Sequence, residues 1–409
     1  MTRRHDIDAL RVFAFALLIA YHLGMVYVAD WGYHVKSTHQ AEWLQWPMIA
    51  LNRWRMPLLF MISGIALGLA MTSRPSWRLA LSRSWRLLLP LGFGMLAIVP
   101  VQAYCEALGN GAIEPGFGAF LARYLQLRPW PEGGWRGAEH GITWNHLWYL
   151  AYVWVYSVVL LAIAPMLDSA AGQQLRSWLF ERHRIVWVLL PAAWLFACLW
   201  WLMPRWPETH ALAGDWYAHA KYLFFFASGW MVAREERFWS GVVAMRWWML
   251  ALALLAISIE LSLRAAGRYL PPGDVPNWAL HLDWRMIERI ARAIYTWSAL
   301  LAIFGWSRTL LDRPFTWLPR AREAVFPWYI LHQSLIVALA FWLSTFQPGP
   351  VWEPLLVAAG TITGCLVLHA GLIHRSRLLR PLFGLPARHR EPSRVIAGGH
   401  LQPSASSRA

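Results

Sequence analysis

Arg11 and His22 are the two side chains in the first apolar run of the chain that could take part in a reaction. They lie in the stretch LRVFAFALLIAYHLGMVYVA. A neutral imidazole can accept a proton, and a guanidinium can bind a phosphate or a carboxylate. On an α-helix the eleven steps between them return the chain to within about 20° of its starting face, about 16 Å further along. Both side chains are therefore expected on one stripe of a helix, and Asp8, three residues before Arg11, is placed to form an ion pair with it.

The helix that carries these residues is expected to be one of about ten that cross a membrane. Hydrophobic residues make up 58% of the chain, charged residues 14%, and the mean hydropathy is +0.36, which excludes an ordinary soluble domain. The predicted fold is an all-α polytopic integral membrane protein. His219 and Lys221 interrupt the sixth apolar run. Runs long enough to span a bilayer begin near Leu10, Trp54, Leu87, His146, Ile185, Trp216, Val242, Ile287, Val325 and Val351.

The distribution of arginines predicts the topology. The chain carries 37 Lys and Arg residues and a formal net charge of +15, but they are spread over successive short loops, as at 74–86, 176–184 and 308–322. Because short cytoplasmic loops collect Lys and Arg, both termini are expected on the cytoplasmic side. The same spread argues against a nucleic-acid partner and for contact with lipid headgroups. Three scattered cysteines predict neither a disulfide framework nor a metal cluster.

Five short elements occur in the order found in the membrane acyltransferase 3 family. The opening stretch HDIDALRVFAFALLIAYH resembles the first helix of that family, in which ten residues separate a basic residue from a His. The run RWRMPLLFMISGIALGL is similar to its second helix, through Pro57, Phe60, Ser63 and Gly64. SRSWRLLLP resembles the Arg-x-x-Arg element of the third helix, carried here by Arg83 and Arg86. NHLWYL at 145–150 and FPWYILHQ at 326–333 resemble two later landmarks.

This resemblance implies an acyltransferase 3 transmembrane domain over residues 1–384, followed by a disordered cytoplasmic tail over 385–409. The amino-acid sequences of the motifs resemble the glucan-modifying branch of the family, which includes glucan biosynthesis protein C, a protein that succinylates periplasmic glucans. It implies an O-acyltransferase of the bacterial inner membrane that moves an acetyl or succinyl group from cytoplasmic acyl-CoA to a hydroxyl of a cell-envelope carbohydrate. Acyl-CoA is then a co-substrate, and no bound cofactor or metal is expected. Membrane lipids and glycan-synthesis proteins are further candidate partners.

The resemblance also implies roles for particular residues. His22 is expected to be the general base. Arg11, positioned by Asp8 at the cytoplasmic surface, is expected to share the phosphates of the donor or to orient other polar groups. The alternative for His22 is a buried structural histidine, although ionisable groups are rarely tolerated in membrane spans without a function. Arg83 and Arg86 are expected to bind the phosphates of coenzyme A. Without the family match, a topological anchor is the better interpretation of that pair.

His146, Tyr149 and His332 are candidates for the acceptor side of the site. Each is at least as well explained as an interfacial or structural residue. Arg53 and Arg55, just before the second apolar segment, are expected to contact either an anionic acceptor or lipid headgroups, and the sequence favours headgroups. Glu260 in the seventh apolar run and Glu353 at the start of the tenth are candidate partners for buried cations.

Two alternative functions remain open from the residues alone. One is a transporter or carrier of an envelope precursor, in which His22 and Lys221, with His219, form a proton or substrate path. Transporters often contain paired halves with broken helices, and the sequence shows no such symmetry. The other is a membrane scaffold without catalysis, which leaves an ionisable His at the midplane unexplained.

Overall fold

The computed structural model describes residues 4–71, 76–131, 133–271 and 281–386, which form helices and connecting loops, with one isolated bridge between Val28 and Ala41. The long apolar runs form helices because a backbone within lipid must satisfy its hydrogen bonds internally. The predicted tail lies outside the described residues, apart from 385 and 386. The helices are α1 (His5–Tyr27), α2 (Gln45–Ala70), α3 (Ser76–Phe93), α4 (Pro100–Gly109), α5 (Phe117–Tyr124), α6 (Trp148–Leu167), α7 (Ala170–Glu181), α8 (Ile185–Ala197), α9 (Trp216–Val232), α10 (Glu236–Tyr269), α11 (Trp284–Leu310), α12 (Leu318–Leu343), α13 (Trp352–Val367) and α14 (Leu379–Leu382).

Within the described residues, seven helical segments are long and apolar enough to cross a membrane: His5–Tyr27, Ser76–Gly109, Asn145–Leu167, Ile185–Leu202, Glu236–Tyr269, Leu318–Ser344 and Trp352–Ile373. The three other predicted runs also form helices, namely α2, α9 and α11. Their apolar character is weaker, because α2 contains two arginines, α9 has 17 residues with a lysine among them, and α11 begins with several charges. The all-helical membrane architecture is confirmed, while the count of ten spans stays a prediction.

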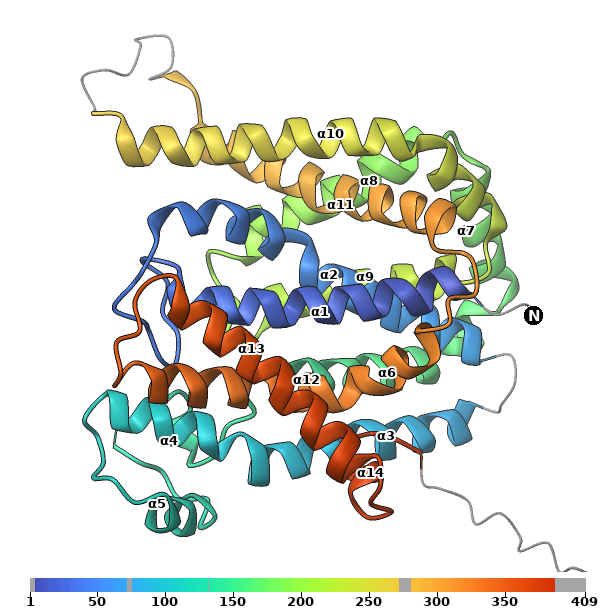
Figure 1. Cartoon of the computed structure of the whole chain (residues 1–409). Coiled ribbons are helices and arrows are strands. Elements are labelled where there is room, and N and C mark those ends of the chain that lie inside the picture. The colour runs from blue at the N-terminus through green and yellow to red at the C-terminus, as the bar shows by residue number, and fades with distance from the viewer. Residues whose placement is uncertain (1–3, 72–75, 132, 272–280, 387–409) are drawn as a thin grey trace, which may run out of the picture.

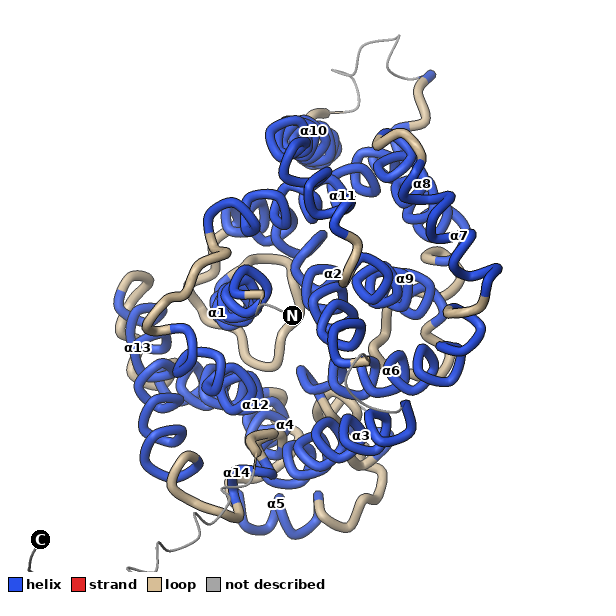
Figure 2. The backbone as a smooth tube through the Cα atoms, turned by 90° about the vertical axis from the view of Figure 1, so that its right-hand side faces the viewer, coloured by secondary structure: helices blue, strands red, loops and turns tan. Residues whose placement is uncertain are grey.

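Helix α1 runs through the bundle between α2 and α12, as Figures 1 and 2 show. The pairs α10–α11, α2–α9, α3–α6 and α12–α13 pack along one another. The start of α1 and helix α7 lie at one end of the bundle, called here the α1-start end, and α5 lies at the opposite end, called the α5 end (Figure 1). Helix α7, which carries Arg176, therefore lies at the same end as the start of α1. The cytoplasmic location of both termini stays a prediction.

Glycines bring α2 and α9 into backbone contact. A Cβ on Gly64 would meet the carbonyl oxygen of Phe226, and one on Gly229 would meet the carbonyl oxygen of Met61. Gly68, four residues after Gly64, also faces the α9 backbone. Small residues at this spacing allow two helices in a membrane to approach closely. The Gly64 of the family-like second helix thus has a packing role.

We expect Gly64→Ala to destabilise the protein by about 1–3 kcal/mol or more, because neither backbone can yield to the added methyl group. Thermal unfolding in detergent measures the effect. Gly92→Ala on α3 is the matched control, since its Cβ would meet nothing within 4 Å. Equal unfolding temperatures of the two variants would contradict the assigned contact.

Candidate functional site

His22 is held by a second histidine from the neighbouring helix α12. Its Nδ1 lies 2.9 Å from Nε2 of His332, and the two ring planes are nearly parallel, at 14°, with centroids 5.1 Å apart. The other nitrogen of His332, Nδ1, lies 3.0 Å from the Trp328 carbonyl and 2.8 Å from the Tyr329 carbonyl. His332 is completely buried, so its ring is fixed on both sides.

These contacts assign the proton positions. Carbonyl oxygens only accept hydrogen bonds, so His332 Nδ1 carries a proton and, in the neutral ring, Nε2 carries the lone pair. His22 Nδ1 must then donate to His332 Nε2. The remaining nitrogen of His22, Nε2, bears the free lone pair. This tautomer is the one that a proton-accepting His22 requires.

His146 lies beside the pair, but both of its nitrogens are occupied. Its ring centroid is 6.4 Å from that of His22, and its Nε2 donates to the carbonyls of Tyr329 and Ile330 at 3.1 and 3.2 Å. Its Nδ1 accepts from Gln102 at 3.3 Å. Of the three clustered imidazoles, only His22 therefore has a free lone pair.

A buried polar network continues behind the three histidines. Gln102 accepts a hydrogen bond from Gln333 at 3.0 Å, and Gln333 also donates to Nε2 of His34 at 3.0 Å. The Nδ1 of His34 lies 2.5 Å from Glu106. Each amide and imidazole thus has a defined donor or acceptor role, which fixes α4 and the loop after α1 around α12.

His22 opens onto a cavity of about 640 Å³. The cavity extends toward the α5 end, because loop residues 136–145 and 208–211 contribute to its wall. Aromatic rings line it together with charged groups from helices α2, α9 and α11 and from the segments before α6 and α9. The lining includes Tyr21, Tyr33, Trp144, Trp148, Tyr149, Tyr222, Arg55, Arg136, Lys221, Arg292, Glu139 and Glu208.

The predicted stripe of α1 continues from this cavity to Arg11. Phe15, between Arg11 and His22 on the stripe, contacts the ring of Tyr329 with centroids 5.4 Å apart and that of Tyr149 at 6.5 Å. Tyr149 also lines the cavity and is an electrostatic neighbour of Arg11. Its hydroxyl donates to the Leu59 carbonyl at 3.0 Å, and its role on the acceptor side stays a prediction.

Arginines from two helices gather near the α1-start end. Arg11 and Arg83 lie within electrostatic range of one another, of Arg86 and of the Tyr149 hydroxyl. Arg83 is half-buried, with its Nε unpartnered among the described residues, whereas Arg86 is exposed. Asp8 accepts from Arg322 of α12 at 3.1 Å and also attracts Arg11. The group therefore has free guanidinium donors for an anion.

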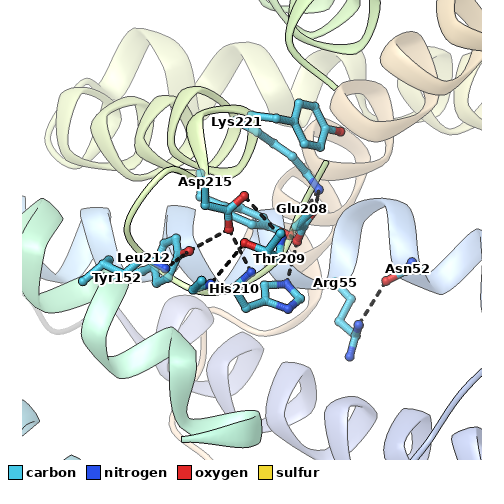
Figure 3. A network of polar contacts seen from close by, with 12 residues as sticks. Asn52, Arg55, Tyr152, Glu208, Thr209, His210, Leu212, Asp215 and Lys221 are labelled. Carbon is cyan, nitrogen blue, oxygen red and sulfur yellow. Dashed lines mark hydrogen bonds and ion pairs between the residues drawn. The ribbon is translucent and has the colours of Figure 1, made fainter. Parts of the chain in front are cut away.

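The loop before α9 carries a carboxylate that the sequence did not single out. Glu208 binds the ammonium of Lys221 at 3.1 Å, His210 at 2.8 Å and the Tyr222 hydroxyl, as part of the network drawn in Figure 3. The loop is anchored by Asp215, which accepts from the His210 amide at 2.9 Å and from the Tyr152 hydroxyl at 2.7 Å. Lys221 thus pairs with a carboxylate within the cavity wall.

The stability that Glu208 contributes is expected to depend on pH. Burial by itself would raise the pKa of this carboxyl, but Lys221 and the hydrogen bonds from His210 and Tyr222 outweigh it and hold the pKa well below its usual value. A carboxyl with a lowered folded-state pKa stabilises the fold above its unfolded pKa of about 4.3, and this stabilisation is lost as the pH falls through the folded value. The unfolding-temperature difference between wild type and Glu208→Gln should therefore be largest at neutral pH and shrink in acid. A constant difference would contradict the assigned ion pair.

Two arginines of α2 do not make the contact with lipid headgroups that the sequence favours. Arg53 donates to Glu260 on α10 at 2.9 Å, which bears out the expected partner for a buried cation. Arg55 is 8% exposed and lies in the cavity wall, with its guanidinium 3.4 Å from the centre of the Tyr21 ring. A headgroup contact for Arg55 is therefore wrong, because the side chain points into the bundle.

Neither the His22–His332 contact nor the Glu208 network could be read from spacing, since each joins residues far apart in the chain. The only available signals were His332 within FPWYILHQ and the lysine that interrupts the sixth apolar run. Among the described residues, no group of three or more His, Cys, Asp or Glu side chains is arranged to hold a metal ion.

A comparison with protein families matches residues 4–370 to the acyltransferase 3 family, whose model describes an acyltransferase domain. The match covers α1 to α13 and includes all the site residues described above. A comparison with curated proteins found no match. A comparison with solved structures found none either.

Proposed function

We propose, from the premise that the chain belongs to the acyltransferase 3 family, that this membrane acyltransferase moves an acetyl or succinyl group from cytoplasmic acyl-CoA to a hydroxyl of an envelope carbohydrate. The observation that carries the proposal is the His22–His332 hydrogen bond, which leaves His22 Nε2 with a free lone pair at the wall of a cavity lined by aromatic and charged groups. That nitrogen is suited to accept a hydroxyl proton.

In the proposed reaction, the acceptor hydroxyl oxygen attacks the thioester carbonyl while His22 Nε2 takes its proton. A new ester C–O bond forms and the C–S bond breaks. The thiolate of coenzyme A then receives the proton from His22, which returns the imidazole to its neutral form. Throughout these steps His332 holds the ring in place, because its Nε2 accepts from His22 Nδ1.

The donor is proposed to reach His22 from the α1-start end. Arg11, Arg83 and Arg86 offer guanidinium groups to the phosphates of coenzyme A, and a helix rise of about 16 Å separates Arg11 from His22. The acyl-bearing arm would pass along the stripe at Phe15, beside Tyr149 and Tyr329. The thioester and its phosphates would thus occupy opposite halves of the bundle.

The acceptor is proposed to enter from the α5 end. Trp144, Trp148 and Tyr222 line the cavity, and aromatic faces with polar edges suit the stacking of sugar rings. Charged groups of the cavity wall supply hydrogen-bond partners for hydroxyls. An inner-membrane location in a bacterium, with glycan-synthesis proteins as suppliers of the acceptor, fits this arrangement and the proposed topology.

Transfer of radiolabel from acetyl-CoA or succinyl-CoA to envelope carbohydrate tests the proposal. Membranes with the wild-type protein should incorporate label, and membranes without it should not. Label on carbohydrate from neither donor would overturn the proposal. If the same membranes then moved an envelope precursor in a His22- and Lys221-dependent manner, the transporter alternative would be favoured.

His332 is expected to position His22 and not to react. We expect His332→Phe to lower the transfer rate by at least about tenfold, because His22 Nδ1–H loses its acceptor, worth about 1 kcal/mol or more when buried. The KM for acyl-CoA should change little, since the arginines are untouched. His332→Gln, which restores an acceptor oxygen, should recover part of the rate. A change in KM alone would show that His332 acts in donor binding.

A further inference from the structure

Arg55 is a buried cation whose charge is not matched by a carboxylate contact. The three most buried lysine and arginine side chains among the described residues are Arg380, Arg55 and Lys221, at 7–8% exposure. Lys221 pairs with Glu208 at 3.1 Å and Arg380 with Glu323 at 3.1 Å. Arg55 has no described carboxylate oxygen within 4 Å, although burying a charge without a partner is costly.

The guanidinium of Arg55 retains free donors at the cavity wall. Its Nη2 donates to Asn52 at 3.0 Å (Figure 3). One face of the guanidinium covers the Tyr21 ring, 3.4 Å from the ring centre. Its Nε is buried and has no hydrogen-bond partner among the described residues. Because a guanidinium carries five N–H donors, most of its capacity is unused within the described part of the protein.

Glu208 does not neutralise Arg55 directly. It lies within electrostatic range of Arg55, but its oxygens are bound by Lys221, His210 and Tyr222. Cationic groups also outnumber acidic groups in the cavity wall, where Arg55, Arg136, Lys221 and Arg292 face Glu139 and Glu208. The cavity that His22 shares with Arg55 therefore favours an anionic ligand.

We propose that Arg55 binds a carboxylate group of a substrate in this cavity. The forked N–H donors of a guanidinium match the two oxygens of a carboxylate. The carboxylate is carried either by the distal end of the acyl group or by an acidic sugar of the acceptor. This inference rests on the proposed function for the identity of the substrates, but carboxylate binding by Arg55 can be measured without transfer.

Carboxylate binding is tested with the full-length protein in detergent by thermal unfolding, followed by tryptophan fluorescence. Succinate is compared with neutral succinamide, and glucuronate with glucose. We expect at least one carboxylate to raise the unfolding temperature of wild type, and its neutral counterpart to leave it unchanged. Arg55→Gln should remove this shift. Arg53→Gln is the matched control, since Arg53 pairs with Glu260 and does not line the cavity, and it should keep the shift.

Transfer assays then identify the source of the carboxylate. Succinyl-CoA and butanoyl-CoA are compared as donors, and neutral and glucuronate-containing oligosaccharides as acceptors. Arg55→Gln should lower the preference for the carboxylate-bearing member of one pair by about tenfold or more, while Arg53→Gln preserves it. A lost preference between donors assigns the carboxylate to the acyl group, and a lost preference between acceptors assigns it to the carbohydrate.

Two results would overturn the inference. The first is that neither succinate nor glucuronate shifts the unfolding temperature in an Arg55-dependent manner. The second is that Arg55→Gln lowers the transfer rate equally for both members of every substrate pair. That result would indicate a structural role for Arg55 or stabilisation of the reacting oxyanion. The proposed function fails separately, if wild type shows no His22-dependent transfer. In that case an Arg55-dependent shift with succinate or glucuronate would still support the carboxylate site.

Discussion

Replacing His22 with Asn is expected to lower acyl transfer by about two to four orders of magnitude, which is the usual contribution of a general base. The Asn amide keeps a donor near the position of Nδ1 and can still bind His332 Nε2, but it has no counterpart of Nε2. The variant therefore loses the free lone pair while it retains the contact between α1 and α12. The measurement is the initial rate of label transfer from acyl-CoA to carbohydrate in membranes with equal amounts of protein.

A matched control is available in His183→Ala. His183 is exposed in the loop between α7 and α8, so its replacement should leave transfer unchanged. The unfolding temperature of His22→Asn should lie close to that of wild type. If His22→Asn folded normally and transferred label at the wild-type rate, the proton would have to be accepted elsewhere, and His22 would be a structural histidine.

Replacing Arg83 with Gln is expected to raise the KM for acyl-CoA by about 10- to 100-fold. A hydrogen bond to a charged group contributes about 1.5–3 kcal/mol, and Arg83 is the more buried member of its pair, with an unpartnered Nε beside Arg11. The kcat should change little, because phosphate contacts remote from the reacting carbonyl contribute equally to ground state and transition state. Initial rates over a range of acyl-CoA concentrations measure both constants.

The exposed arginines of α3 provide a graded comparison. Arg86→Gln should have a smaller effect than Arg83→Gln, because Arg86 is exposed to solvent. Arg78→Gln, on an exposed position near the start of the same helix, should leave KM unchanged. Equal increases for all three variants would indicate general attraction of an anionic donor by the basic end of the bundle and would remove Arg83 as a specific contact.

The stripe on α1 shows how much of the site follows from local sequence. Arg11, Phe15 and His22 recur at helical spacing, and Phe15 indeed contacts rings beside both ends of the stripe. The placement of all ten apolar runs on helices likewise followed from composition, because lipid-exposed backbone must pair internally. Helix bounds and the number of spans were less well defined, since α2, α9 and α11 mix apolar residues with charges.

Arg55 shows where local sequence is insufficient. Arg53 and Arg55 are two residues apart in the same apolar context, and both were expected to contact an anionic acceptor or lipid headgroups, with headgroups favoured. In the structure one faces Glu260 on α10 and the other faces the cavity, because a shift of two positions turns a helical side chain by about 200°. The residue that each arginine contacts depends on how α2 packs in the bundle. Gly64 of α2 and Gly229 of α9 set that packing, because they allow the two backbones to come into contact.

The sequence by itself determined that the chain is a helical membrane protein of the acyltransferase 3 family with Arg11 and His22 on one face of a helix. These properties depend on composition, on local periodicity and on short motifs. Tertiary structure alone decided that His332 fixes the tautomer of His22, that Glu208 pairs with Lys221, and that Arg55 lies without a carboxylate contact in the cavity. Each of these depends on atoms from helices or loops that are distant in the chain, and hydrogen bonds and ion pairs act over only a few ångströms, so nothing short of the packed bundle could define them.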